Sequence, residues 1–341
     1  MKKSSQPTIK DVAKEAGVSV GTTSNHITGR SAVSERSSAL ISKAIKKLGY
    51  RHNVIAARLR KQQSMTIGIC IPELSNPFFH KLMQSLNREM EKDFYESILV
   101  ETSDIEKRNN NKLKALYNKQ VDGVFLIPHL DWDGWVDTEV PIILLDRPRK
   151  KEVLPSIALD NFSAAITGTE YLFELGHKNV WFVVNTNELW NASERQAGFK
   201  DIARRFGYHE QCRVIEGGLS AHDIADSINK ALNKYDMPSA IFASNEYAAL
   251  GVLRALSKNN IQIPNQISVL TFDDAHWTNI LNPAVSVLRQ PVEEMARLAW
   301  LNMKTLLRAE CIENMHIQLQ GKLVIRESVL TKIRKGEMIA I

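Results

Sequence analysis

The sequence has only three cysteines and no long apolar run. Cys70, Cys212 and Cys311 lie far apart, so they exclude a disulfide framework and no pair has the spacing of a metal site. The longest apolar stretches, such as residues 141–145 and 180–184, are far shorter than the roughly 20 residues that a membrane span needs. The basic N-terminus lacks the apolar core of a secretory signal. We therefore expect a cytoplasmic protein without a membrane partner.

The sequence also lacks the local motifs of the common enzyme classes. It contains no nucleophile elbow, no Walker-type or dinucleotide-binding glycine pattern and no His-Glu-x-x-His metal pair. Asp273, Asp274 and His276 are compatible with a general acid and base or, with another ligand, a metal site. Carboxylates that accept the hydroxyls of a bound sugar explain these residues more simply. We expect a protein that is not an enzyme and needs no cofactor.

Positive charge is concentrated at one end of the chain. The length of 341 residues, with 44% hydrophobic and 24% charged residues, predicts two or three globular domains. Residues 1–62 carry thirteen Lys and Arg against three acidic residues, whereas the other 279 residues carry 31 basic and 35 acidic residues. The net charges are therefore +10 and −4. A basic segment joined to an acidic body is typical of nucleic-acid binding, with a solvated charged face as the alternative.

The basic segment has the pattern of three short helices. Thr8 is a candidate N-cap for a first helix, which Gly17 ends. Ser19 is a candidate cap for a second helix, whose small polar face suits close approach to base edges in a DNA major groove. Ser34 is a candidate cap for a third helix, which ends at Gly49. The pattern predicts a helix-turn-helix, although an unrelated helical bundle has the same periodicity.

Two stretches of this segment give a more specific indication. Thr8-Ile-Lys-Asp-Val-Ala-Lys-Glu-Ala-Gly-Val-Ser19 and Gly49-Tyr-Arg-His-Asn53 resemble the signature of the LacI/GalR family of bacterial transcriptional regulators. The resemblance implies that the helix beginning near Val20 enters the major groove and that the stretch after Asn53 folds into a hinge helix on operator DNA. It implies DNA contacts at Thr8, Ser19, Val20, Gly21, Thr22, Ser24, Asn25, His26, Asn53, Ala56, Ala57, Leu59 and Arg60.

Two of these residues carry separate expectations. By resemblance, Leu59 is the wedge that enters the minor groove and kinks the duplex, whereas a leucine in a basic helix is otherwise a packing residue. The segment Gly21-Thr-Thr-Ser-Asn25 departs from the usual family pattern Ala-Thr-Val-Ser-Arg. Asn pairs bidentately with adenine and Arg prefers guanine, so we expect an unusual operator half-site.

From Met65 onward, short apolar strands alternate with amphipathic helices. This pattern favours parallel sheets covered on both faces, and roughly 260 residues are too many for one such sheet. The expected fold is an all-α helix-turn-helix head of the λ-repressor type plus an α/β core of two doubly wound parallel-sheet lobes, like a periplasmic binding protein. The expected strands are residues 66–71, 97–101, 123–127, 142–146, 180–184, 240–243, 268–272 and 285–288.

We expect four segments along the chain. They are a DNA-binding head at 1–52, a hinge at 53–63, an effector-binding and dimerisation domain at 64–332 and a tail at 333–341. The tail lacks a sustained leucine heptad, which favours a homodimer over a tetramer. Within the large domain, the N-lobe is expected at about 64–161 and 291–318, and the C-lobe at about 162–290 and 319–332.

Polar and aromatic residues at the ends of the expected strands match the effector pocket of the family. Ligands of open parallel sheets bind at the carboxyl ends of the strands, and two facing lobes form a cleft there. Arg195 is the strongest candidate, because a guanidinium forks onto vicinal hydroxyls or a carboxylate. Core packing explains the two phenylalanines equally well, and the histidine is either a ligand contact or a surface residue. The candidates are Phe78, Phe79, Asp146, Trp190, Arg195, Asn245, Asp273 and His276.

These observations predict a repressor that binds near-palindromic double-stranded operator DNA as a homodimer and responds to a small molecule in the cleft. The effector must bind one conformation more tightly than the other, because equal affinity shifts nothing. Aromatic rings with carboxylates suit an uncharged sugar, whereas Arg147, Arg195 and His276 suit a sugar acid or sugar phosphate. The alternatives are a corepressor-dependent regulator and a sugar-binding receptor or sugar-modifying enzyme with an incidental basic head.

Overall fold

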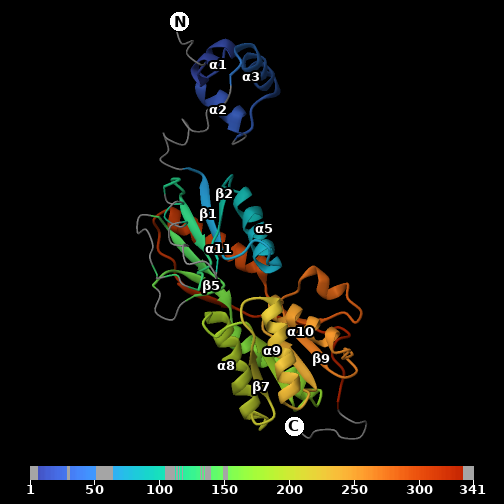
Figure 1. Ribbon diagram of the computed structural model, residues 1–341. Coiled ribbons are helices and arrows are strands. Elements are labelled where there is room, and N and C mark those ends of the chain that lie inside the picture. Colours follow the sequence, from blue (N-terminus) through green and yellow to red (C-terminus); the bar gives the residue numbers. More distant parts are fainter. Residues whose placement is uncertain are drawn as a thin grey trace. The chain divides into compact units, whose positions relative to one another are not determined.

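A computed structural model divides the chain into two compact units, Met1–Ser64 and Met65–Ile341 (Figure 1). The structure describes residues 7–28, 31–50, 64–103, 118–130, 140–148 and 153–332, and the single residues 112, 114, 116, 132 and 134. The expected hinge contacts Asn53, Ala56, Ala57, Leu59 and Arg60, and the expected tail, lie outside these ranges. None of the helices in these ranges is long and apolar enough to cross a bilayer.

The first unit contains the three predicted helices, α1 (Ile9–Ala16), α2 (Val20–Thr28) and α3 (Glu35–Leu48). They enclose a small core of Val12, Ala16, Ile41 and Ala44. At the start of α1, the Asp11 carboxylate accepts the backbone N–H and the hydroxyl of Thr8, at 2.8 and 2.7 Å. These bonds hold the pKa of Asp11 below its ordinary value. Gly17 and Gly49 end α1 and α3 with φ of +66° and +61°, which glycine adopts without strain.

The first lobe of the second unit is a wholly parallel six-stranded sheet in the order β11-β5-β4-β3-β1-β2. Helices α5 (Pro77–Glu91) and α11 (Val292–Leu307) pack on one face through a shared apolar core. That core accounts for the continuously buried strands β1, β3, β4 and β5, whereas the edge strands β2 and β11 are partly exposed. The strands are β1 (Thr66–Ile71), β2 (Glu96–Glu101), β3 (Gly123–Leu126), β4 (Ile142–Leu145), β5 (Ser156–Leu159) and β11 (His316–Leu319).

The second lobe is a six-stranded sheet in the order β12-β10-β9-β8-β6-β7, parallel except for β12. Alternate side chains face opposite layers: Phe182 and Phe242 face α7 (Asn161–Glu174) and α8 (Trp190–Arg205), whereas Trp181 and Ile241 face α9 (Ala221–Lys234) and α10 (Glu246–Lys258). A short helix, η1 (His276–Asn279), follows β9. The strands are β6 (Val180–Val184), β7 (Arg213–Glu216), β8 (Ala240–Ala243), β9 (Ser268–Phe272), β10 (Ser286–Arg289) and β12 (Lys322–Val324).

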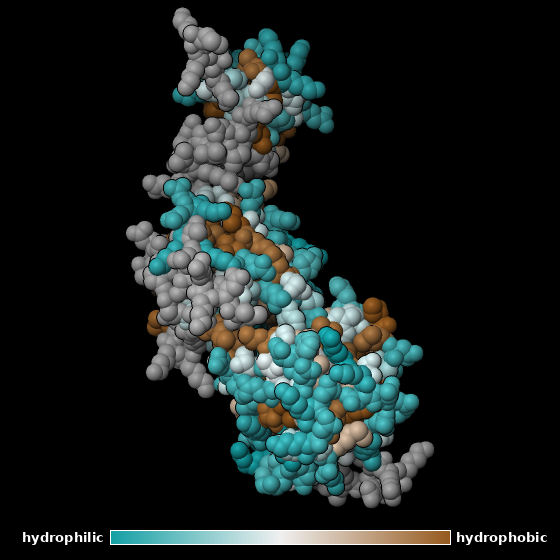
Figure 2. Space-filling view, in the orientation of Figure 1, coloured by the Kyte–Doolittle hydropathy of each residue, from teal (hydrophilic) through white to brown (hydrophobic). Residues whose placement is uncertain are grey.

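The chain passes between the two sheets where β5 leads to α7, where β10 leads to α11 and where β11 leads to β12. The visible face of this unit is largely hydrophilic, with apolar patches on both lobes (Figure 2). The predicted fold class is confirmed, and the eight expected strands are present with ends shifted by at most about one residue. Strands β5, β7, β11 and β12 were not predicted. β7, β11 and β12 each contain exposed and half-buried residues, which removes the continuous apolar signal. β5 is buried throughout, but its four residues include only two large apolar side chains, Ile157 and Leu159.

Candidate functional site

The second helix of the head presents a small, polar and partly exposed surface. The Ser19 hydroxyl caps this helix by accepting the backbone N–H of Thr22 at 3.0 Å. Thr23 is fully buried, and its hydroxyl donates to the Ser19 carbonyl at 3.0 Å. Val20 is 43% exposed, and Gly21 beside it is also exposed. The exposed start of α2 has the small side chains that a helix needs to approach base edges closely.

His26 has a structural role within the head. Its two ring nitrogens lie 3.1 Å from the hydroxyls of Ser38 and Ser42, so it joins α2 to α3. Thr8 likewise donates its hydroxyl to Asp11 at the start of α1. The other described candidates on α2 are Thr22, Ser24 and Asn25, which are all half-buried. Binding of DNA by these side chains remains a prediction.

Two adjacent cavities lie between the lobes of the second unit. The first, of about 270 Å³, is bounded by α5 and the start of α11 on one side and by Glu246, Asp273 and Gln290 on the other. The second, of about 450 Å³, is bounded by the loop after β1 and by Asn185, Asn245 and Tyr247. Neighbouring residues line different cavities: Phe78 and Glu246 the first, and Phe79, Asn245 and Tyr247 the second.

The structure brings five of the eight candidate effector residues to these cavities. Phe78, Asp273 and His276 line the first, and Phe79 and Asn245 line the second. The two phenylalanines also belong to the core, with 8% and 4% of their surface exposed, so the packing interpretation applies to them as well. Asp146, Trp190 and Arg195 do not line either cavity. Asp146 is buried and accepts a hydrogen bond from Asn191 at 3.1 Å, and Trp190 is half-buried at the start of α8.

Arg195, in the first half of α8, is only 2% exposed. Its Nε donates to Asn161 Oδ1 at 2.7 Å, its Nη1 donates to the Ser244 carbonyl, and its guanidinium carbon lies 4.1 Å from the centre of the Phe272 ring. Burial lowers the pKa of Arg195, and the negative charges of Asp273 and Asp146 oppose that shift. Its Nη2 has no hydrogen-bond partner among the described residues.

Buried polar atoms without partners gather at the carboxyl ends of the C-lobe strands. Asn185 Oδ1, Ser244 Oγ and Gln290 Oε1 have no hydrogen-bond partner in the part of the chain that the structure describes. Each residue directly follows a strand, β6, β8 and β10 in turn. Buried polar groups are normally hydrogen-bonded, so their concentration here indicates a binding site. These residues are not among the candidates predicted from the sequence, although their position directly after apolar strands could have identified them.

Glu246 is an acidic residue of the first cavity that the sequence analysis also did not select. It is 7% exposed and accepts a hydrogen bond from Trp277 Nε1 at 2.8 Å. Burial raises the pKa of Glu246 to about 7, and the negative charges of Asp273 and Glu73 add to the shift. The next residue, Tyr247, donates its hydroxyl to the Glu73 carboxylate of the N-lobe. This hydrogen bond connects the two lobes directly.

Asp273 lies beside Glu246 on the wall of the first cavity. Gln290 Nε2 donates to its carboxylate at 2.7 Å. Burial raises the pKa of Asp273, whereas the charge of Arg195 and the bond from Gln290 oppose that shift. No group of three or more His, Cys, Asp or Glu within the described ranges is arranged to hold a metal ion.

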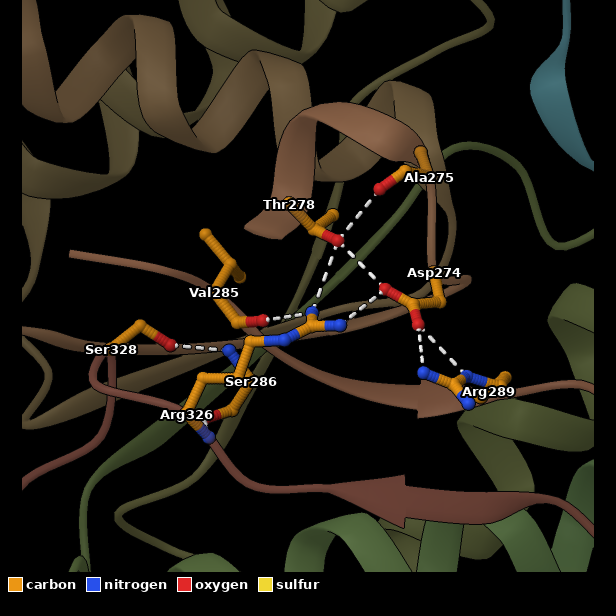
Figure 3. A network of polar contacts seen from close by, with 8 residues as sticks. All are labelled: Asp274, Ala275, Thr278, Val285, Ser286, Arg289, Arg326 and Ser328. Atoms are coloured by element: carbon orange, nitrogen blue, oxygen red, sulfur yellow. Dashed lines mark hydrogen bonds and ion pairs between the residues drawn. The ribbon is translucent and has the colours of Figure 1, made fainter. Parts of the chain in front are cut away.

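A second carboxylate, Asp274, holds this loop in place (Figure 3). It accepts Arg289 Nε at 2.8 Å, Arg326 Nη2 at 2.7 Å and the Thr278 hydroxyl at 2.8 Å. Burial opposes ionisation, but these bonds hold the pKa of Asp274 below its ordinary value. Arg326 also donates to the Val285 carbonyl at 2.7 Å. The network therefore fixes the start of η1 against β10 and the segment after β12, next to the cavity wall.

Comparison with known proteins places this geometry among transcriptional regulators. The family model "Bacterial regulatory proteins, lacI family" matches residues 8–53, and the model "Periplasmic binding protein-like domain" matches residues 169–329. Catabolite control protein A of Priestia megaterium is 26% identical over 327 residues, covering 94% of this chain and 98% of that protein. The ribose operon repressor of Halalkalibacterium halodurans is 28% identical over 323 residues, covering 94% and 96%.

Solved structures show the same fold over almost the whole chain. The lac repressor dimer bound to operator and the anti-inducer ONPF has a TM-score of 0.79 and 21% identity, covering 96% of this chain and 100% of that one. The transcriptional regulator CelR in complex with cellobiose has a TM-score of 0.70 and 23% identity, covering 94% and 99%.

Proposed function

This chain belongs to the LacI family of bacterial regulatory proteins, and from that premise we propose a dimeric repressor controlled by a small hydroxylated effector. The protein is a DNA-binding transcriptional regulator and not an enzyme. One observation carries the proposal: the chain that bears a helix-turn-helix head also bears a cleft whose floor holds buried, unpartnered polar atoms. It would act in the cytoplasm, where operator DNA is found.

The proposed DNA contacts begin at the exposed start of α2. Ser19, Val20 and Gly21 carry short side chains or none, so the helix backbone can come close to base edges and phosphates. Asn25 would read adenine in place of the guanine that Arg prefers. The hinge at 53–63, with Leu59 as its wedge, would then bend the operator, and the unstacking cost would be offset by contacts to the bent duplex.

The proposed effector contacts are the polar atoms at the strand ends of the C-lobe. The side-chain oxygen of Asn185, which lines the second cavity, would accept a ligand hydroxyl, and Phe78 and Phe79 supply apolar edges from the N-lobe. Arg195 Nη2 and Ser244 Oγ also have no hydrogen-bond partner among the described residues, but neither residue lines a cavity in this lobe arrangement. The CelR structure contains a bound sugar, cellobiose, which supports a sugar-like effector here. Asp273 would accept further hydroxyls.

Control follows from the position of the site between two lobes. An effector that contacts both lobes stabilises one lobe arrangement, and it shifts DNA affinity only by its difference in affinity for the two arrangements. The Tyr247–Glu73 hydrogen bond already joins the lobes and would be made or broken in that movement.

Selection of duplexes from a random library at two salt concentrations tests the proposal. We expect an enriched palindrome with a deformable central step, because two heads related by two-fold symmetry read two half-sites. Phosphate contacts alone would give salt-sensitive binding without a consensus. If no sequence is enriched, even when a metabolite mixture supplies a corepressor, the proposed operator binding is wrong.

A further inference from the structure

Three acceptor groups meet on the C-lobe wall of the first cavity. They are the carboxylates of Glu246 and Asp273 and the side-chain oxygen of Gln290. Glu246 and Gln290 are 7% and 3% exposed, so both are held in place by the surrounding fold. Gln290 uses its amide nitrogen to donate to Asp273 at 2.7 Å, which leaves its oxygen without a partner among the described residues. This orientation adds an acceptor, and not a donor, to a wall that already carries two carboxylates.

The charged groups around Glu246 do not compensate the negative charge of its carboxylate. The two charged groups that act on it most strongly are carboxylates, Asp273 from the end of β9 and Glu73 from the loop after β1. Its hydrogen bond from Trp277 Nε1 comes from a neutral indole. No described Lys, Arg or His forms an ion pair with Glu246.

The basic groups that line the same cavity bind other acids. Lys81 of α5 pairs with Glu293 of α11 at 3.0 Å, and Arg289 of β10 pairs with Asp274. The remaining titratable groups of the lining are His80 and Arg88 of α5 and His276 of η1, of which all three are exposed. Arg195, which does not line the cavity, offsets part of the charge of Asp273, whereas no described cation acts in this way on Glu246. The wall around Glu246 therefore attracts positive charge and hydrogen-bond donors.

We propose that this wall binds the amino group of the effector, so that the effector is a hydroxylated amine such as an amino sugar. The inference rests on the proposed function, because it names the ligand class of the same cleft. A protonated amine carries three donors and one positive charge, which match two carboxylates and one amide oxygen. A neutral sugar supplies no positive charge to stabilise ionised Glu246, and a sugar acid or sugar phosphate adds a like charge.

Calorimetric titration of the full chain at pH 7 tests the assignment with matched pairs of ligands. The probes are D-glucosamine, D-galactosamine and D-mannosamine, each compared with the hexose that has a hydroxyl in place of the amine. We expect at least one amine to bind about tenfold more tightly than its hexose, as one charge-assisted hydrogen bond contributes. Glu246→Gln should reduce this preference to less than about twofold, because the amide keeps the shape without the charge.

Glu294→Gln is the matched control. It makes the same chemical change on a carboxylate of α11 that pairs with Arg297 at 2.6 Å and does not line the cavity, so the amine preference should persist. The comparison of each amine with its hexose needs no variant, so it decides the question even if Glu246→Gln does not fold.

Three results would overturn the assignment: equal binding of amines and hexoses, an amine preference that survives Glu246→Gln, or no binding by any of the amines. Release of the selected operator by a neutral hexose would refute the proposal that the effector is an amine, and it would still support the proposed repressor function. A preference for amines without sequence-specific DNA binding would refute the proposed repressor function, and it would still support the proposed amine-binding site.

Discussion

Substitution of Glu246 by Gln should stabilise the protein at alkaline pH and leave its stability almost unchanged in acid. Burial raises the pKa of this carboxyl from its ordinary value of 4.5 to about 7, so the folded protein holds its proton where the unfolded chain has lost it. Between those two values the folded state binds more protons, and the free energy of unfolding falls as the pH rises. Above about pH 7 both states are ionised and the loss is complete.

The size of the effect follows from the shift. Each pH unit corresponds to 1.36 kcal/mol, so the full shift corresponds to about 3 kcal/mol, and solvent screening reduces this to about 2 kcal/mol. The glutamine oxygen can still accept the bond from Trp277 Nε1, so the variant removes the charge without removing that contact. The gain in stability of Glu246→Gln over the natural chain should therefore grow from near zero at pH 4.5 to about 2 kcal/mol at pH 8.

Urea unfolding followed by circular dichroism at several pH values measures this difference. Titrating groups that do not interact with Glu246 are shared by both proteins, and their contributions cancel. Glu294→Gln, which changes an exposed carboxylate, should show no such growth with pH. The reasoning is refuted if Glu246→Gln is no more stable than the natural chain at pH 8, or if its gain is the same at every pH.

Three further substitutions test other parts of the structure. Arg195→Ala should keep operator affinity in a mobility-shift assay and abolish the effector response, because the contacts of the Arg195 side chain lie within the C-lobe. A folded variant that cannot bind operator would contradict this prediction. Asp274→Asn should lower the free energy of unfolding by about 2 kcal/mol, because Arg289 and Arg326 both lose their carboxylate partner. An unchanged thermal unfolding temperature would show that the hydrogen-bond network of Asp274 does not stabilise the fold. Asn25→Ala should weaken binding to the selected operator about tenfold with little change on a scrambled duplex, and equal losses on both would exclude base readout.

Most of the fold could be predicted because its signals are local. Thr8, Ser19 and Ser34 cap helices by bonds within three or four residues, and Gly17 and Gly49 end helices by their own backbone conformation. Most strands of the sheet centres are buried on both faces and form apolar runs, whereas the interior strand β5 was missed because it is short and begins with a serine. Strands β7, β11 and β12 lie at sheet edges or ends, where only some of the side chains are buried.

The candidate site was less accessible to prediction because its properties arise from distant segments. Asp273 could be selected from its place after a strand, as could Asp146. Asn185, Ser244 and Gln290 occupy equivalent places, but amides and hydroxyls also occur in ordinary turns, so only their burial without partners distinguishes them. The environment of Glu246 depends on Glu73, Asp273 and Trp277, which no sequence spacing relates.

The three passages of the chain between the lobes limit how the protein can move. Strands β5 and β11 are neighbours in the first sheet, and β10 and β12 are neighbours in the second, so the connections run close together at one side of the cleft. Several adjacent covalent links resist twisting and sliding much more than bending about one axis. These links therefore favour a hinge-like movement of the lobes, and a ligand that contacts both lobes with different affinity in the two arrangements acts on that movement. A small molecule of almost any chemistry could then produce the same mechanical output, which lets a changed pocket serve a new signal without redesign of the DNA-binding end.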